Sequence, residues 1–524
     1  MTRSMVAVLA ASLWGCSMAG GLGGGGDDGP GPGSGQPCDP AVERCTDGCM
    51  TADTDADGWS DEVETAMETS PTDAEDNPPA RDQLVFVVPY QAQPQPGAHD
   101  VEATAKLQRA DVAILLDTTG SMVGTTSRIQ GELAEMATLI ANEIDDVAIG
   151  AAGYGDFPVY DGANSHVDVP FYLVHRMMTT RTAAGAMSVL ASFRYRNMFD
   201  GLGNWFSVMR GGDEPEQHWE ALRQAATGMG ITYPSPFAGG APISQPPFNA
   251  QTAYPATPPA GEEVGTIGGF GFRRDSTPII IQITDTNAHV GGMTTTTPVS
   301  ATRPVALAAL RAIGARVVGI MAWITVGQDD LTAMTIDTGG QVPPTAWGVA
   351  PDRPANCPVG RCCVVAEDEI VRPQPAPVNG LCPLVFQADR YSMNLAKMVS
   401  QAVVAVSRGA KFEIGAELRD DAADAVNVAS FVDDIAALPA GACAGATVTD
   451  LDQDGAPDAF TAVVGGSPVC FRITPRSNDS VPGTDVARRY QGIVQLTGDG
   501  VGSFATREIW FVVPTAACTP PIFL

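Results

Sequence analysis

Three oxygen-bearing side chains alternate directly after the apolar run of residues 112–116: Asp117, Thr119 and Ser121. We expect a buried strand to end here, and open α/β sheets bind ligands at the carboxyl ends of their strands. Hydroxyls with a single carboxylate suit Mg²⁺, which keeps several waters and takes few charged protein ligands. The alternative is an ordinary strand-to-helix turn that is capped by Ser and Thr.

Two distant segments can add carboxylates to this group. Residues 213–216 read Asp-Glu-Pro-Glu before an expected helix, and Asp285 follows an expected buried strand at 279–283. Parallel strands deliver their carboxyl ends to one edge of a sheet, which would bring these residues together. Both segments are therefore candidates to complete the Asp117 group.

The first stretch resembles the metal-ion-dependent adhesion site of von Willebrand factor A domains, which has the pattern Asp-x-Ser/Thr-x-Ser. The Asp-x-Pro-Glu loop at 213–216, and the strand that ends Thr284-Asp285 with His289 after it, are similar to integrin β subunits. The similarity covers roughly residues 82–524. It implies an A domain that is inserted in a β-sandwich and that binds an acidic group of a partner through the metal. The Mg²⁺ ligands that the resemblance implies, several of them through water, are Asp117, Thr119, Ser121, Glu216 and Asp285.

The same resemblance implies a neighbouring calcium site and the loss of a third site. Gly124 and Thr125 stand where integrins carry an acidic pair for a regulatory ion, so no third ion is expected. Gly211 replaces an integrin Asn ligand of the calcium. The implied calcium ligands are Asp156, Asp213, the Pro215 carbonyl and Glu216.

Residues 53–64 have the spacing of a calcium loop. Oxygen donors fall at positions 1, 3, 5, 9 and 12, and Gly58 at position 6 permits a tight turn. The loop resembles the calcium repeats of bacterial surface proteins and thrombospondin type 3 segments; the alternative is a solvated acidic loop. The predicted ligands are Asp53, Asp55, Asp57, the Trp59 carbonyl, Asp61 and Glu64. A weaker loop, for which calcium and a simple turn are both open, contains Asp450, Asp452, Asp454 and Asp458, with Thr461 at position 12.

The composition limits the possible partners. The chain has 524 residues and a formal net charge of −30, from 60 acidic and 30 basic residues. This acidity argues against nucleic-acid binding, which needs basic surfaces. Five histidines occur without a metalloprotease helix motif, and Ser121 lies in no Gly-x-Ser-x-Gly elbow, so no enzyme is predicted.

The N-terminal region predicts export. Residues 1–18 read as a signal peptide in which residues 13–16, Leu-Trp-Gly-Cys, look like a bacterial lipobox with lipidation at Cys16. Ordinary signal cleavage near Ala19, or a tail that is never removed, are the alternatives. Residues 19–37 form a Gly-rich tether. Ten other cysteines could form disulfides in an oxidising compartment, which suits an outer-membrane lipoprotein or a cell-surface protein.

The remaining chain divides by pattern. Strands and helices alternate over residues 110–410, which predicts a doubly wound α/β domain, Rossmann-like in topology. Residues 411–524 show short alternating strands, which predict an immunoglobulin-like all-β sandwich that residues 82–109 join. Residues 38–80 form a cysteine-containing calcium-binding segment. Within the α/β domain we expect a long loop at 231–266 and an insertion with four cysteines at 342–388.

These features together predict a cell-envelope adhesion or protein-binding module. Mg²⁺ in the Asp117 site would capture an acidic group of a protein or other surface ligand, and calcium would stabilise the loops. The membrane would be reached only through the N-terminal lipid. The alternative function is a surface protein that calcium and disulfides stabilise, without metal-mediated ligand binding.

Overall fold

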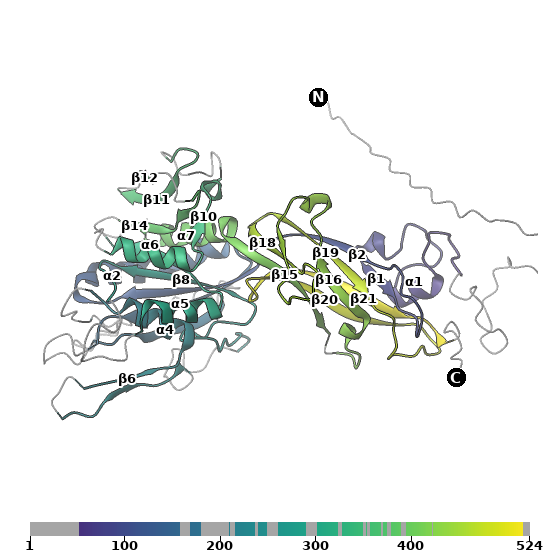
Figure 1. The fold of residues 1–524 in the computed structure, drawn as a ribbon, viewed down its shortest axis with the longest axis horizontal. Helices are drawn as coiled ribbons and strands as arrows, with labels where there is room; N and C mark the ends of the chain where they lie inside the picture. The colour runs from purple at the N-terminus through teal and green to yellow at the C-terminus, as the bar shows by residue number, and fades with distance from the viewer. Residues whose placement is uncertain are drawn as a thin grey trace, which may run out of the picture.

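A computed structural model of the chain describes residues 52–157, 168–179, 209, 215–235, 239–248, 260–289, 301–322, 327–348, 353, 357–367, 370–374, 379–388, 395–421 and 423–516. The predicted signal peptide, Cys16, the Gly-rich tether and Asp213 lie outside these residues. The described residues form two units that lie end to end, an α/β unit and a β unit (Figure 1). None of the helices in the described part has the length and apolarity to cross a bilayer.

The α/β unit is built on one mixed eight-stranded sheet with the order β12-β11-β14-β9-β8-β3-β4-β5. Its central strands β9, β8, β3 and β4 run parallel, and β5 closes one edge in antiparallel orientation. These five strands are β3 (Arg109–Asp117), β4 (Asp146–Tyr154), β5 (Tyr172–Thr179), β8 (Thr277–Thr284) and β9 (Arg316–Met321).

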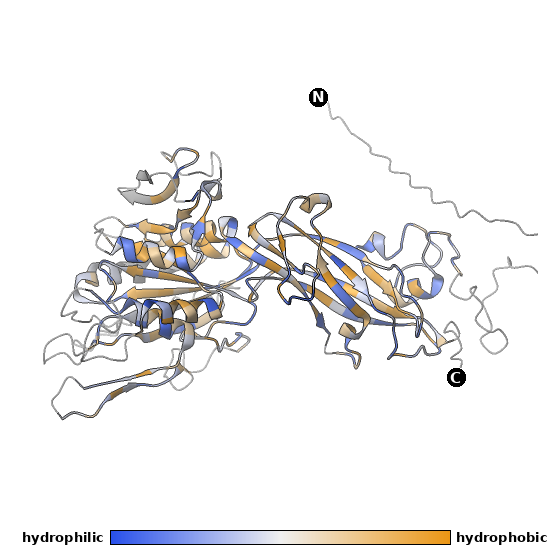
Figure 2. Ribbon diagram, in the orientation of Figure 1, coloured by the Kyte–Doolittle hydropathy of each residue, from blue (hydrophilic) through white to orange (hydrophobic). Residues whose placement is uncertain are grey.

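Helices cover both faces of this sheet because its strands are apolar on both sides. Along β3, Ile114 and Leu116 share a core with α2 (Val123–Ala141) and α7 (Leu395–Gly409). Leu115 faces the opposite core. That core includes residues of α4 (His218–Thr227), α5 (Arg303–Ala312) and α6 (Gln328–Asp337). The predicted α/β architecture is confirmed, and Figure 2 shows the hydrophobic strands between the helices.

The predicted cysteine insertion and the predicted long loop both contain strands. The cysteine segment adds β11 (Cys362–Glu367), β12 (Ile370–Gln374) and β14 (Val385–Gln387) to the main sheet, with β14 parallel to β9. This segment therefore extends the main sheet. Disulfides Cys357–Cys363 and Cys362–Cys382 tie it together, and β10 (Gln341–Val342) pairs with β13 (Cys382–Pro383). In the predicted long loop, β6 (Ile231–Tyr233) and β7 (Ile243–Gln245) form an antiparallel pair.

The β unit contains two sheets, with orders β1-β21-β20-β15-β18-β17 and β16-β19-β2. Phe86 and Phe511 from the first sheet share a core with Val101 and Ile473 from the second. Cys443 and Cys470 form a disulfide. The strands are β1 (Leu84–Val87), β2 (His99–Thr104), β15 (Lys411–Asp420), β16 (Val432–Ala437), β17 (Val448–Thr449), β18 (Ala459–Val464), β19 (Pro468–Pro475), β20 (Arg488–Gly498) and β21 (Gly502–Val513).

A continuous chain segment and two ion pairs join the α/β unit to the β unit. Helix α7 leads directly into β15 through Ala410. Arg316 of β9 forms an ion pair with Asp499, and Arg419 of β15 forms one with Asp275. At the opposite end of the β unit lies the short helix α1 (Asp61–Met67) (Figure 1). Short 3₁₀ helices occupy Pro79–Arg81, Gly120–Met122, Pro344–Trp347, Val428–Phe431 and Gly441–Cys443.

Candidate metal sites

Asp117 is the last residue of β3, and its carboxylate is buried at the carboxyl edge of the main sheet. The backbone N–H and the hydroxyl of Thr119 both donate to Asp117 Oδ1, at 3.0 and 2.7 Å. Thr284, the last residue of β8, donates its hydroxyl to Asp117 Oδ2 at 2.7 Å. Two neighbouring strand ends therefore fix this carboxylate from both sides.

Ser121 connects this group to Asp285. Its hydroxyl donates to Asp285 Oδ1 at 3.2 Å and lies 3.4 Å from Thr119 Oγ1. Adjacent oxygens around an octahedral ion with bonds of 2.0–2.1 Å lie about 2.9 Å apart. The observed spacings of 2.7 to 3.4 Å and the all-oxygen donor set fit Mg²⁺. Four of the five predicted ligands, Asp117, Thr119, Ser121 and Asp285, thus form one connected set.

Burial dominates the electrostatics of this set. The pKa of Asp117 is raised to about 6, because burial and the nearby Asp285 charge outweigh the Thr119 backbone N–H, which lowers it. A cation between the two carboxylates would relieve both effects, because it compensates the buried charge and screens the repulsion.

Glu216 lies beside the segment that comes after Asp285. Its backbone N–H donates to the Asn287 carbonyl at 3.0 Å, and its carbonyl accepts from the His289 N–H at 2.8 Å. The residue is buried. Among the described residues, however, the acidic groups with oxygens within 4.8 Å of one another do not include Asp117, Glu216 and Asp285. Direct coordination by all three carboxylates would need a small movement, or water between ligand and ion.

The implied calcium site next to Glu216 is described only in part, because Asp213 lies outside the described residues. Asp156 Oδ1 accepts from the Phe157 N–H at 2.8 Å and from Gln217 Nε2 at 3.0 Å. Asp156 Oδ2 lies 3.2 Å from His289 Nε2. Protein groups thus already contact both oxygens of Asp156. Asp213 is not described, and Pro215 is half-buried.

His218 is a contributor that sequence reasoning missed. Its Nε2 lies 3.2 Å from Thr284 Oγ1, and its ring meets Tyr154 edge-on at 5.5 Å. Burial lowers the His218 pKa to about 3, so the ring is neutral. Because the Thr284 hydroxyl donates to Asp117, the His218 Nε2–H is assigned as the donor to Thr284. A lone histidine at a helix start carries no signal for this role; only packing reveals it.

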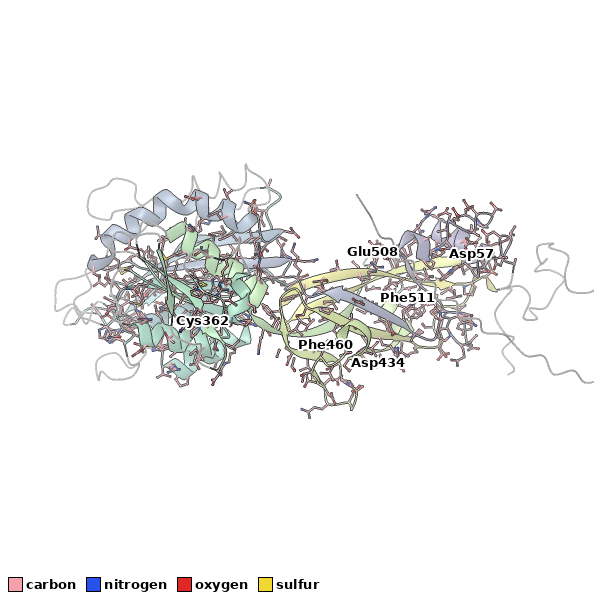
Figure 3. The ribbon with its side chains drawn as sticks, turned by 90° about the horizontal axis from the view of Figure 1, so that it is seen from above. Asp57, Cys362, Asp434, Phe460, Glu508 and Phe511 are labelled. Atoms are coloured by element: carbon pink, nitrogen blue, oxygen red, sulfur yellow. A yellow bond between two sulfur atoms is a disulfide. The ribbon has the colours of Figure 1, made fainter. Side chains whose placement is uncertain are left out.

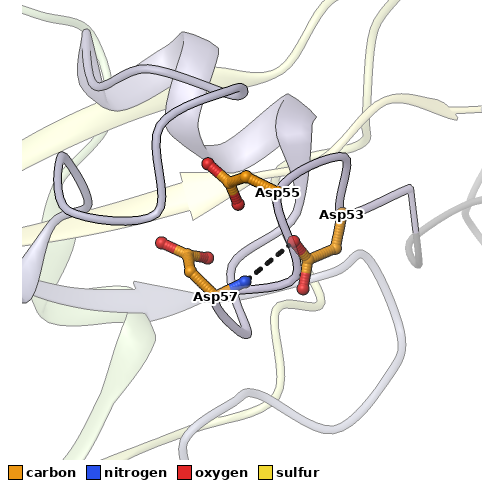
Figure 4. A group of neighbouring side chains, drawn as sticks. All are labelled: Asp53, Asp55 and Asp57. Atoms are coloured by element: carbon orange, nitrogen blue, oxygen red, sulfur yellow. Dashed lines mark hydrogen bonds between the residues drawn. The ribbon is translucent and has the colours of Figure 1, made fainter.

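The loop at residues 53–64 has three aspartates whose carboxylate oxygens lie within 4.8 Å of one another: Asp53, Asp55 and Asp57 (Figure 4). Asp53 accepts from the backbone N–H groups of Asp57 at 3.2 Å and Gly58 at 2.9 Å. Gly58 has φ of +98°, a conformation that favours glycine. The turn therefore gathers three negative charges around one point.

Glu64, at position 12 of this loop, gives an independent sign of a ligand. Its side chain is fully buried, and neither carboxylate oxygen has a hydrogen-bond partner in the structure. Both oxygens of Asp55 and Oδ2 of Asp57 are in the same condition. Burial, and then the charges of Asp57 and Asp55, raise the Glu64 pKa to about 7. Buried unpaired carboxylates are costly, and a hard cation would satisfy them, so these residues fit Ca²⁺.

Asp61 and Trp59 have supporting positions in this loop. The Asp61 carboxylate accepts from the Thr54 N–H at 2.8 Å and from the Thr54 hydroxyl at 2.6 Å, which closes the loop. The Trp59 N–H donates to Asp57 Oδ1 at 2.8 Å. Asp61 thus joins the two ends of the loop; it contributes one oxygen to each of its two hydrogen bonds with Thr54.

The second loop repeats this scheme. Asp450 accepts from the N–H groups of Gln453 at 2.6 Å and Gly455 at 2.9 Å, and Asp458 accepts from the Leu451 N–H at 2.8 Å. The carboxylate oxygens of Asp450, Asp452 and Asp454 lie within 4.8 Å of one another. Asp452 and Asp454 are exposed.

No protein-family model matches the sequence, and no curated protein matches it. Among solved structures, a von Willebrand factor type A protein from Catenulispora acidiphila is 12% identical, with a TM-score of 0.30, over 84% of this chain and 74% of that one. The pilus adhesin SpaC from Lactobacillus rhamnosus GG, in an open conformation, is 11% identical, with a TM-score of 0.27. That match covers 80% of this chain and 45% of the adhesin, so the chain spans less than half of the adhesin's length. TM-scores this low do not establish a shared fold.

Proposed function

We propose that this protein is a cell-envelope adhesion or protein-binding module that captures an acidic ligand group through Mg²⁺ in the Asp117 site. The observation that carries the proposal is the connected set of Asp117, Thr119, Ser121 and Asp285 at the carboxyl edge of the sheet. Bound Mg²⁺ would supply a coordination position that a partner's carboxylate can take from water.

The chain's own residues prepare this site. Thr119 and Thr284 hold the Asp117 carboxylate in one orientation, so its oxygens need no rearrangement on binding. Ser121 is exposed, which leaves the site accessible from solvent, while Asp117 beneath it is buried. No catalytic step is proposed: the Ser121 hydroxyl bonds to Asp285, and His218 is neutral and directed to Thr284.

The test compares metal binding with ligand capture. Isothermal titration with Mg²⁺ should show binding to the native protein and a loss of at least tenfold in Asp117→Ala and Ser121→Ala. Exposed Asp329, at the start of α6, provides the control, and Asp329→Ala should bind Mg²⁺ normally. A partner recovered from envelope extract should be lost with chelator and with Asp117→Ala. Equal recovery without divalent ions would contradict the proposal.

The resemblance to integrin β subunits extends this proposal to the β unit. We propose an immunoglobulin-like sandwich that the α/β unit interrupts. Support comes from β1 and β2, which precede the α/β unit and pair with β21 and β19, which come after it. Expression of residues 110–410 alone tests this: the α/β unit should remain folded, with a cooperative melt.

We also propose that the protein is exported and anchored by lipid on Cys16. Three disulfides in the described part of the chain support an oxidising compartment. Metabolic labelling with palmitate should mark the native chain, and Cys16→Ser should abolish the label. Label that persists in Cys16→Ser would exclude this anchor.

A second function remains a candidate because Glu64 and the aspartates beside it fit Ca²⁺. The protein would then be a structural surface protein that calcium and disulfides stabilise. Thr119→Ala distinguishes the two: a structural protein would lose melting temperature without losing a partner, whereas a binding module would lose the partner.

A further inference from the structure

Helix α1 covers part of the outer face of the six-stranded sheet. Along β1, Phe86 points into the core between the two sheets, whereas Val85 and Val87 belong to a separate cluster on the other face. In that cluster they pack with Val63 and Met67 of α1. Val85, Val87 and Val512 form what we call the valine patch, and all three are buried.

Polar contacts hold both ends of the helix to neighbouring strands. The Glu62 carboxylate accepts from the Thr515 N–H, just beyond β21. Glu68 forms an ion pair with Arg489 of β20. The Arg489 side chain in turn lies over the Trp510 ring, 5.0 Å from its centre. The helix is thus seated on β1, β20 and β21, strands from the two ends of the chain.

Helix α1 is too short to be stable in isolation. It has seven residues, and isolated helices shorter than about 12–15 residues are marginal in water. Its conformation must come from the loop that precedes it and from the valine patch beneath it. Ser60 caps its N-terminus by accepting from the Val63 N–H, which connects the helix directly to the loop.

Seating the helix also buries Glu64. Val63 and Met67 enter the apolar cluster, while Glu64, adjacent to Val63, is fully buried beside the loop aspartates without a hydrogen-bond partner. Without a cation, docking therefore brings a buried carboxylate against Asp55 and Asp57. With a cation, the same geometry supplies the ligands. Docking and ion binding should favour each other.

We propose that Ca²⁺ bound by residues 53–64 docks helix α1 on the valine patch, so that calcium controls whether α1 covers this patch. The inference rests on the calcium site proposed above and is independent of the Asp117 site. When calcium is removed, α1 detaches and Val85, Val87 and Val512 become exposed.

Thermodynamic linkage provides the decisive variant. Met67→Ala removes packing between α1 and the valine patch without touching a predicted ligand. If docking and binding are coupled, this variant must bind Ca²⁺ more weakly, by roughly 5-fold or more. Glu64→Gln should strengthen docking, whereas Met67→Ala weakens it. Because Glu64→Gln removes the buried charge, the helix stays docked in chelator. Its calcium affinity should nevertheless fall at least tenfold.

The experiment uses the full chain, isothermal titration with Ca²⁺, limited proteolysis at α1 and the fluorescence of an apolar dye. The native protein should bind the dye and be cleaved at α1 only in chelator. Asp452→Asn, in the second loop, is the matched control and should behave like the native protein. If chelator makes α1 susceptible to cleavage but does not increase dye binding, the docking role is overturned. Unchanged calcium affinity in Met67→Ala would overturn it as well. Absence of Ca²⁺ binding would overturn the site itself, and Mg²⁺ binding at Asp117 would be unaffected by either result.

Discussion

The two acidic loops, residues 53–64 and 450–461, have the same backbone conformation but lie in different surroundings. In each, the aspartate at position 1 accepts from the glycine at position 6, and the aspartate at position 9 accepts from position 2. Gly58 and Gly455 have φ of +98° and +99°. The loop shape therefore arises from local side-chain-to-backbone hydrogen bonds and needs no particular partner elsewhere.

The loops differ at position 12 and in the element that each one enters. The first leads into α1 and buries Glu64, whereas the second leads into β18 and has Thr461, whose N–H donates to the Thr447 carbonyl. Near the second loop, burial and the charge of Asp454 raise the pKa of Asp434, a β16 residue. Figure 3 shows Asp57 and Asp434 on different parts of the β unit. The comparison shows that the loop motif alone brings three aspartates together. Only the first loop also has a buried carboxylate, Glu64, which makes ion binding depend on the packing of α1.

The largest expected difference is in ion affinity. Asp55→Asn should weaken Ca²⁺ binding at least tenfold, because Asp55 oxygens lie buried and unpartnered in the first loop. The matched change Asp452→Asn, at position 3 of the second loop, should leave the tightest calcium site unchanged, because Asp452 is exposed. Titration calorimetry measures both. Equal losses would show that the two loops are equivalent and would break the comparison.

A smaller effect is expected from the glycines at position 6. A Cβ at Gly58 or Gly455 would meet no atom within 4 Å, so substitution costs only backbone strain, roughly 1 kcal/mol. Both Gly58→Ala and Gly455→Ala should lower the free energy of unfolding by about this amount in chelator, as denaturant titration would report. With Ca²⁺ present, only Gly58→Ala should lose additional stability. Identical behaviour of the two variants in calcium would argue against a functional difference between the loops.

A pH dependence is also expected at the first loop. The Glu64 pKa rises from 4.5 to about 7 on folding, so the folded protein binds this proton more tightly. Its contribution to stability is complete below about pH 4.5 and is lost as the pH rises through about 7. Calcium-free native protein should therefore lose melting temperature over this window relative to Glu64→Gln. Parallel pH profiles for the two proteins would mean that Glu64 is not buried in solution.

Sequence patterns predicted the parts of the structure that depend on local sequence. The apolar run before Asp117 and the run before Asp285 predict strands, and parallel pairing of β3 with β8 then places both residues at one sheet edge. The mixed α/β fold was predicted from the same alternation. The spacing of residues 53–64 likewise indicates a tight acidic turn without knowledge of its neighbours.

Other features depend on contacts that no short pattern encodes. His218 approaches Thr284 only because α4 packs against the end of β8. The cysteine segment shows little periodicity because its strands are short and disulfides hold it, so β11 and β14 read as an insertion. Glu64 could be proposed as a ligand from spacing, but its burial beside the valine patch required the three-dimensional arrangement.

The pairing of β1 with β21 has a consequence for biosynthesis. Leu84 is opposite Ile509 in a parallel register, so β1 must wait until almost the whole chain has been synthesised before its partner is available. Pairing of such high contact order is slow and leaves an unpaired strand exposed. The α/β unit, whose contacts lie between these strands in sequence, can fold earlier. Nascent chains that stop before Gly502 should therefore contain a folded α/β unit and an incomplete β unit that is prone to aggregation.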